Sequence, residues 1–185
     1  GISQLNNKTL HIKDSSTIGT GIQLNEALNK GATTIYMGLG GSATNDAGLG
    51  ILYAIGFKFL DQHNKEMIPT SGNLAQIQKI IPKSYPHTKF YIINDVDNPL
   101  YGPKGAAAIY APPQGASPSE VEELDQSLKQ LSERIKRDFG VDIATIPGTG
   151  AAGGTAIGLL AFLVTFTLDI FRLVATVMGP PSFAI

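Results

Sequence analysis

The amino-acid sequence predicts a layered α/β fold, in which a sheet is flanked by helices. Runs rich in β-branched and apolar residues alternate along the chain with runs whose apolar residues recur at helical spacing. Three glycine-rich or polar segments follow β-rich runs, as loops do at the carboxyl edge of a sheet in this fold class. The 185 residues are enough for one substantial hydrophobic core.

The first part of the chain predicts a helix followed by a strand. Residues 21–30 place Leu24 and Leu28 on one helical face, and Gly31 suits a left-handed C-terminal cap. The apolar, β-branched run TTIYMGL (33–39) predicts a strand that is covered on both faces. This strand leads directly into the first glycine-rich segment.

Four further elements are expected before residue 100. A helix capped by Asn45 or Asp46 is expected to end near residue 55. The alternating run FKFLDQHNKEMI (57–68) predicts a hairpin. A short helix is expected near 73–80, and KFYIINDV (89–96) predicts a second buried strand.

The helix with the clearest boundaries follows Ser117. Ser117 is its N-cap, Pro118 its first residue and Glu120 the acidic member of a capping box, while Gly140 ends it. VDIATI (141–146) then predicts a third strand. The helix carries one apolar stripe, formed by Val121, Leu124, Leu128, Leu131 and Ile135.

Composition and charge exclude several classes of protein. Fourteen Lys and Arg against fifteen Asp and Glu give a net charge of −1, so no global field draws the chain to nucleic acid or to an anionic membrane. Cysteine is absent, which excludes a disulfide framework and a thiolate metal site. These features predict an intracellular, cytoplasmic protein.

The C-terminal part of the chain is strongly apolar, but Asp169 and Arg172 interrupt it. A buried helix followed by a buried strand is therefore predicted instead of a membrane span. The chain begins in mid-pattern at Gly1, without a leader sequence, and is interpreted as a fragment of a longer protein.

Three segments form the candidate site: GLGGSATNDAG (38–48), NDVDNPLYGPKGAA (94–107) and PGTGAAGG (147–154). Each follows a predicted strand, so all three can line one site beyond the strand ends. Their glycines let backbone N–H groups approach an anion closely, although such turns can also simply connect strands to helices. Candidate substrate- and phosphate-binding residues are Gly40, Gly41, Ser42, Thr44, Asn45, Asn98, Gly105, Gly148, Gly150, Gly153 and Gly154.

Two aspartates, Asp46 and Asp95, are the candidate catalytic residues. Phosphoryl transfer requires an oxygen-ligated Mg²⁺ and a carboxylate near the accepting hydroxyl, and both aspartates suit these roles. They are therefore also the candidate magnesium ligands. Each has a structural alternative, Asp46 as a helix N-cap and Asp95 as a turn-former.

A competing motif is the G-x-G-x-x-G formed by Gly148, Gly150 and Gly153, with Asp169 about twenty residues further on, as in a dinucleotide-binding βαβ unit. Pro147 and the short distance to the next β-rich run count against it. A non-catalytic nucleotide- or dinucleotide-binding module that uses this loop is the alternative function. No G-K-[ST] sequence, the end of a Walker-type phosphate loop, occurs in the chain.

In this order and spacing, the three segments resemble the bacterial glycerate kinase family of the glyoxylate- and glucarate-pathway type. SSTIGTGIQLNEALNKGA (15–32) is similar to that family's upstream segment, and the resemblance extends over roughly residues 15–160. It implies a kinase that uses ATP and Mg²⁺ to phosphorylate D-glycerate, usually to 2-phosphoglycerate, in a cleft between two α/β domains. Residues 1–160 are then expected to form part of a two-domain kinase, and 161–185 an apolar tail that the family pattern does not explain.

The sequence departs from the family pattern at Ala47, where a glycine is usual, and at Asn94, which replaces a frequent cysteine. APPQGA (111–116) stands where Q-K-G-A is usual, so a candidate phosphate-contacting lysine is missing and Lys104 is its candidate replacement. The family's N-terminal D-S-F-K-G and C-terminal G-E-G-R-x-D segments are outside this chain. The sequence therefore supports the fold and the family's function better than it supports activity of this fragment alone.

Overall fold

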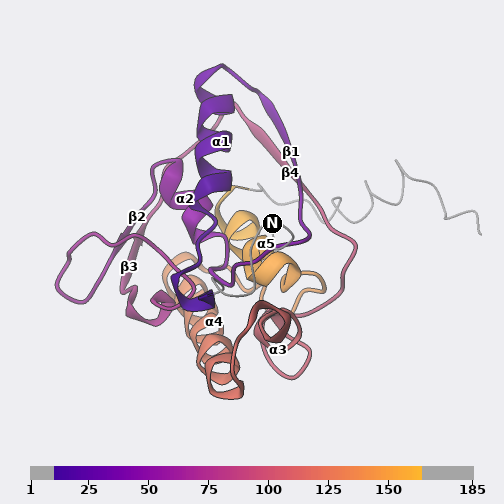
Figure 1. The fold of residues 1–185 in the computed structure, drawn as a ribbon. Helices are drawn as coiled ribbons and strands as arrows, with labels where there is room; N and C mark the ends of the chain where they lie inside the picture. The colour runs from indigo at the N-terminus through magenta and orange to yellow at the C-terminus, as the bar shows by residue number, and fades with distance from the viewer. Residues whose placement is uncertain (1–10, 164–185) are drawn as a thin grey trace, which may run out of the picture.

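The computed structural model describes residues 11–163, and it confirms the predicted α/β class (Figure 1). Helices and strands alternate along the chain, and the helices flank the strands. The helices are α1 (Ile18–Asn29), α2 (Leu49–Ala54), α3 (Ala106–Tyr110), α4 (Pro118–Phe139) and α5 (Ala151–Phe162), with 3₁₀ turns η2 (Ile12–Asp14), η3 (Leu74–Gln76) and η4 (Pro112–Gln114). The strands are β1 (Thr34–Gly38), β2 (Lys58–Leu60), β3 (Lys79–Ile81) and β4 (Lys89–Ile93).

The parallel pairing of β1 with β4 decides where two of the candidate loops begin. Thr34 pairs with Lys89 and Gly38 pairs with Ile93, so the two strands end at the same edge. Leu39 continues the ladder, because its N–H donates to the carbonyl oxygen of Ile93 at 2.8 Å. The segments that follow β1 and β4 therefore start side by side.

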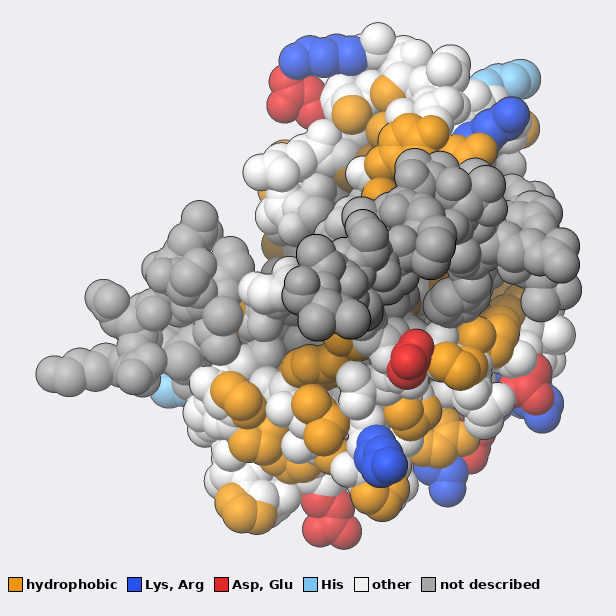
Figure 2. Space-filling model, turned by 90° about the vertical axis from the view of Figure 1, so that its right-hand side faces the viewer, with side chains coloured by type: hydrophobic (Ala, Val, Ile, Leu, Met, Phe, Trp, Pro, Cys, Tyr) orange, Lys and Arg blue, Asp and Glu red, His pale blue; other side chains and the backbone are white. Residues whose placement is uncertain are grey.

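β1 and β4 are covered on one face only by the described part of the chain, so the prediction of burial on both faces is wrong. Successive side chains of a strand point to opposite faces. Phe90 and Ile92 are buried, whereas Tyr36 is 64% exposed and stacks on Tyr91 with ring centroids 4.9 Å apart. Ile93 is also exposed, and Figure 2 shows hydrophobic side chains gathered on this side of the molecule at the height of β1 and β4.

The predicted hairpin over residues 57–68 is confirmed. A bridge joins Leu60 to Glu66, and the N–H of Met67 donates to the carbonyl oxygen of Phe59 at 2.9 Å. On its other side β2 pairs with β3 in antiparallel fashion.

Two predicted elements differ from the structure. The helix expected over 73–80 is limited to η3, because the chain then extends into β3 to pair with β2. Residues 141–146, predicted as a strand, pair with no strand in the described part of the chain and form a loop. The carbonyl oxygen of Ala144 in this loop instead accepts hydrogen bonds from the N–H of Leu100 at 3.3 Å and from Thr149 Oγ1 at 3.0 Å.

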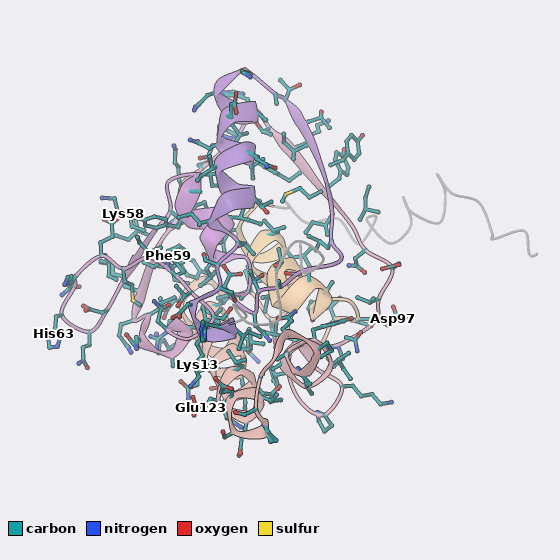
Figure 3. The ribbon with its side chains drawn as sticks, in the orientation of Figure 1. Lys13, Lys58, Phe59, His63, Asp97 and Glu123 are labelled. Atoms are coloured by element: carbon teal, nitrogen blue, oxygen red, sulfur yellow. The ribbon has the colours of Figure 1, made fainter. Side chains whose placement is uncertain are left out.

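α5 contacts both α2 and α3 and lies at the centre of Figure 1. α1 and α2 approach each other at Gly21, where an added Cβ would lie 2.6 Å from the Cβ of Ala54 and 2.7 Å from the Cα of Ile51. α4 contacts α3 and η3. Lys13 and Glu123 form an ion pair that ties η2 to α4 (Figure 3).

The predicted caps of α4 are confirmed. Ser117 Oγ accepts from the N–H of Glu120, and the Glu120 carboxylate accepts from the N–H of Ser117 at 2.8 Å. Gly140 adopts the left-handed conformation, with φ of 70°, at the C-terminal end. The predicted stripe is buried at Leu124, Leu128, Leu131 and Ile135.

The buried helix predicted after the last glycine-rich segment is confirmed as α5. The strand predicted after it, together with Asp169 and Arg172, lies outside the described residues. Across residues 11–163, the helices are all too short or too polar to cross a membrane. The division of the chain near residue 160 stays a prediction.

Candidate active site

A pocket of about 390 Å³ lies at the carboxyl ends of β1 and β4, and this volume is in the range of small-molecule sites. All three predicted segments contribute to its wall. A fourth segment, from the end of α3 through η4, completes it. The lining residues are Leu39, Gly40, Gly41, Ser42, Asp95, Val96, Tyr110, Pro113, Gln114, Ala152 and Gly153.

The structure separates the predicted site residues into two groups. The pocket wall contains Gly40, Gly41, Ser42, Asp95 and Gly153. The wall does not include the remaining predicted residues, namely Thr44, Asn45, Asp46, Asn98, Lys104, Gly105, Gly148, Gly150 and Gly154. Thr44 is nevertheless close, since its Oγ1 lies 2.8 Å from Ser42 Oγ.

Gly40 and Gly41 form an open part of the wall. A Cβ added at either residue would meet no atom within 4 Å, and Gly41 has φ of 59°, which favours glycine. Within residues 11–163, the N–H groups of Gly40, Gly41 and Ser42 have no backbone acceptor. Consecutive free N–H groups in a turn suit an anionic ligand.

The glycines of segment 147–154 are required mainly by close packing. A Cβ added at Gly153 would lie 1.8 Å from the carbonyl oxygen of Thr44, and one at Gly150 would lie 2.2 Å from that of Pro99. The segment is thus inserted between the other two loops, where a side chain has no space. Gly153 keeps a place on the pocket wall, but Gly150 is covered by protein.

Asp95 is exposed on the pocket wall beside Tyr110. The Tyr110 hydroxyl donates to Asn98 Oδ1 at 2.7 Å, and Asn98 Nδ2 donates to the carbonyl oxygen of Lys104 at 2.9 Å. Burial, followed by the charge of Asp95, raises the pKa of Tyr110, so the hydroxyl keeps its proton at neutral pH. The part of Lys104 that takes part in these hydrogen bonds is its backbone carbonyl group.

Asp46 is fully buried at the N-termini of α1 and α2. Its Oδ2 accepts from the N–H and Oγ1 of Thr17 at 2.7 and 2.9 Å and from the N–H of Gly50 at 3.2 Å. Its Oδ1 accepts from the N–H of Gly48 at 3.1 Å. Because helix N-termini favour negative charge, this carboxylate joins the starts of the two helices.

The pKa of Asp46 is raised above its ordinary value, because the effect of burial outweighs the hydrogen bonds from Thr17, Gly48 and Gly50, which lower it. The partners that contact its oxygens are donors, and donors stabilise the ionised carboxylate. The N-cap of α2 is Gly48, so neither Asn45 nor Asp46 caps this helix as predicted. Asp46 lies two residues before the cap and accepts from the N–H groups of Gly48 and Gly50. Its catalytic and magnesium-binding roles stay predictions.

Sequence reasoning missed Tyr110 and Gln114. Gln114 Nε2 donates to the carbonyl oxygen of Ser42 at 2.8 Å, and its Oε1 is buried with no hydrogen-bond partner among the described residues. The available signal was the unusual run APPQGA (111–116), which adjoins Tyr110. Asn45 is a further buried amide, and both of its polar atoms are without a partner in the same part of the chain.

Residues 11–163 contain no group of three or more His, Asp or Glu side chains that could hold a metal ion. Among the described residues of the pocket wall, Asp95 is the acidic one. Mg²⁺ is commonly bound by one or two carboxylates, while substrate phosphates and water supply its other ligands. The Asp95 carboxylate fits this mode of binding.

Comparison with known proteins decides the family. The sequence model of the glycerate kinase family matches residues 1–181. The chain belongs to the glycerate kinase family. The resemblance carried by the three glycine-rich and polar segments is thereby confirmed, and these segments are the ones that surround the pocket.

Individual family members agree with this result. The chain is 43% identical over 149 residues to a glycerate 2-kinase of Escherichia coli (strain K12) and 40% identical over 153 residues to a glycerate kinase of Halalkalibacterium halodurans. These matches cover 78% and 80% of this chain, and 39% and 40% of the relatives. A crystal structure assigned to glycerate kinase 2 of Salmonella typhimurium LT2 superposes with a TM-score of 0.85 at 31% identity, covering 96% of this chain and 49% of that one.

The chain therefore spans about two fifths of the length of the curated relatives it matches. The family membership does not favour the dinucleotide-binding alternative. The structure adds two observations against it: the expected strand over 141–146 is a loop, and Gly150 is covered by Pro99. The acidic partner expected at Asp169 lies outside the described residues.

Proposed function

We propose that the full-length protein containing this chain transfers the γ-phosphoryl group of ATP to D-glycerate and releases 2-phosphoglycerate. The observation that carries the proposal is the pocket at the ends of β1 and β4, in a chain of the glycerate kinase family. Its wall contains Asp95 and also Gly40, Gly41 and Ser42, whose N–H groups have no backbone acceptor within residues 11–163. Besides Mg²⁺, this reaction requires donors for an anion and an acceptor for a hydroxyl proton.

The glycine-rich loop is proposed to bind the anionic part of the ligands. The N–H groups of Gly40, Gly41 and Ser42 are suited to a carboxylate or a phosphate oxygen, and the absence of side chains at the glycines allows close approach. Ser42 and Thr44 add two hydroxyl groups at the same end of the pocket.

Asp95 is proposed as the general base. As the accepting hydroxyl oxygen attacks the γ-phosphorus, its proton passes to the Asp95 carboxylate, and the bond from phosphorus to the bridging oxygen of ADP breaks. Mg²⁺ bound through Asp95 and phosphate oxygens would neutralise phosphate charge. Lys104 and Asn98 are proposed to act on the shape of this loop, because their described contacts are with protein groups.

Asp46 is proposed as a positioning residue. Its contacts with Thr17, Gly48 and Gly50 fix the starts of α1 and α2, and Gly48 continues directly from the glycine-rich loop. Gly150 and Gly153 contribute in the same way, because they set how closely the three loops approach each other. A cytoplasmic location, where ATP is supplied, is part of this proposal.

A coupled assay of ADP release by the full-length parent protein tests the function. We expect ADP release that requires D-glycerate and Mg²⁺ together, and ³¹P NMR of the product should give the signal of 2-phosphoglycerate. If the parent protein phosphorylates no small hydroxy acid, the proposed function is wrong. Binding of NAD⁺ by the same protein, without glycerate-dependent ADP release, would instead support the dinucleotide-binding alternative.

A further inference from the structure

Tyr110 lies on the pocket wall, and its hydroxyl proton is already used in a hydrogen bond to Asn98. Asn98 Nδ2 donates to the carbonyl oxygen of Lys104 at 2.9 Å, which fixes the orientation of the Asn98 amide. Asn98 Oδ1 then faces Tyr110 and accepts from its hydroxyl at 2.7 Å. The phenolic oxygen keeps its acceptor capacity, since a hydroxyl can donate one hydrogen bond and accept others.

The charge of Asp95 reinforces this arrangement. Asp95 and Tyr110 line the same pocket, and the carboxylate opposes ionisation of the phenol. Two residues of the wall therefore carry acceptors, Asp95 its carboxylate and Tyr110 its phenolic oxygen. A second carboxylate or a phosphate oxygen is a poor match for two acceptors, whereas a hydroxyl group that donates its proton is a good match.

Gln114, four residues further on, also has its donor group hydrogen-bonded within the protein. Its Nε2 is engaged by the carbonyl oxygen of Ser42 at 2.8 Å, so the amide is held in one orientation. Its Oε1 is left as an acceptor without a partner in the described part of the chain, and the residue is only 3% exposed. The Oε1 atom is enclosed by protein, so it is not among the acceptors that the pocket wall offers to a ligand.

We propose that the Tyr110 oxygen accepts a hydrogen bond from one hydroxyl group of the bound hydroxy acid and so makes Tyr110 a specificity residue. This inference rests on the proposed function, since the ligand is the hydroxy acid that the enzyme phosphorylates. The anionic end of the ligand binds at the N–H groups of the glycine-rich loop. Its hydroxyl end faces Tyr110 and Asp95.

Calorimetry on the full-length protein with three ligands tests the inference. The ligands are D-glycerate, D-lactate, which lacks the 3-hydroxyl, and 3-hydroxypropionate, which lacks the 2-hydroxyl. Tyr110→Phe should weaken D-glycerate binding about tenfold, the loss expected for one hydrogen bond to a ligand. The analogue that lacks the recognised hydroxyl should bind the variant and the wild type equally, while the other analogue should lose affinity as D-glycerate does.

Tyr101→Phe is the matched control, because Tyr101 is close in sequence and is not on the pocket wall. It should change none of the three affinities. If Tyr110→Phe weakens all three ligands by the same factor, or none of them, Tyr110 only supports Asn98 or Mg²⁺ binding and the inference is wrong. If the wild-type protein binds none of the three, the proposed function fails as well, so the two failures are distinguishable.

Discussion

Gly153 and Thr44 are in such close contact that a Cβ added to Gly153 would lie 1.8 Å from the Thr44 carbonyl oxygen. More than a hundred residues of sequence separate the two, yet their backbones meet at the pocket. Gly153 also has φ of 69°, a conformation that strains any residue with a side chain. This contact holds the start of α5 against the glycine-rich loop.

Gly153→Ala should therefore destabilise the protein strongly. The methyl group can be accommodated only if one of the two backbones moves, and the positive φ adds strain, so we expect a loss of about 3 kcal/mol or more. Thermal unfolding of the full-length protein measures it as a fall in the midpoint. Gly40→Ala is the control, because nothing lies within 4 Å of an added Cβ there, and its midpoint should be unchanged. Equal midpoints for the two variants would contradict the packing role of Gly153.

Asp46→Asn should lower stability more than it lowers turnover. The carboxylate accepts hydrogen bonds at both oxygens, so the amide nitrogen of an asparagine must face a donor such as the N–H of Gly48 or Thr17. Leaving a buried donor without an acceptor costs about 1–3 kcal/mol, which thermal unfolding detects. An unchanged midpoint combined with a hundredfold fall in kcat would instead support the catalytic role predicted from the sequence.

The cap of α4 predicts a pH dependence that NMR can follow. Hydrogen bonds from the N–H and Oγ of Ser117 lower the pKa of Glu120 below its ordinary value of 4.5. The folded state therefore favours the ionised carboxylate, so the contribution of the cap is present above pH 4.5 and is lost as the pH falls through the lower, folded pKa. Ser117→Ala removes one of the two donors and should move the titration of the Glu120 carboxyl carbon part of the way back towards 4.5. A titration identical in both proteins would show that Ser117 Oγ has no part in the shift.

Local signals in the sequence predicted the parts of the fold that depend on neighbouring residues. The ends of α4 follow from Ser117, Glu120 and Gly140, whose hydrogen bonds and backbone angle lie within the helix itself. The strand predicted over 141–146 failed because a strand also needs a partner, and none of the described strands lies beside this run. β-branched residues favour strands, but a strand forms only where the fold supplies a neighbouring strand.

The sequence predicted which segments form the candidate site, but not which of their residues line the pocket, because that depends on tertiary contacts. Gly40 and Gly150 look alike in the sequence, since an anion site and a close backbone contact both exclude a side chain. Only the fold places Gly40 on an open wall and Gly150 against the carbonyl oxygen of Pro99. Asp46 is similar, because its contact with Thr17 joins residues 29 positions apart. Tyr110 belongs to no sequence motif, so only its position in the pocket identifies it as a candidate.

The pocket at the ends of β1 and β4 is proposed as the place of phosphoryl transfer. Asp95 lies on its wall, whereas Asp97, on the same loop after β4 (Figure 3), does not. Both side chains are exposed, so replacing either carboxylate by an amide should leave the fold intact. The pair therefore separates a role in the pocket from a general effect of charge.

The most direct test is the kcat of the full-length protein with D-glycerate and ATP for Asp95→Asn and Asp97→Asn. We expect Asp95→Asn to lower kcat by a factor on the order of 10² or more, as for loss of a general base, while Asp97→Asn stays near the wild-type value. Near-normal kcat in Asp95→Asn, or an equal loss in both variants, would contradict the assignment of the active site to this pocket.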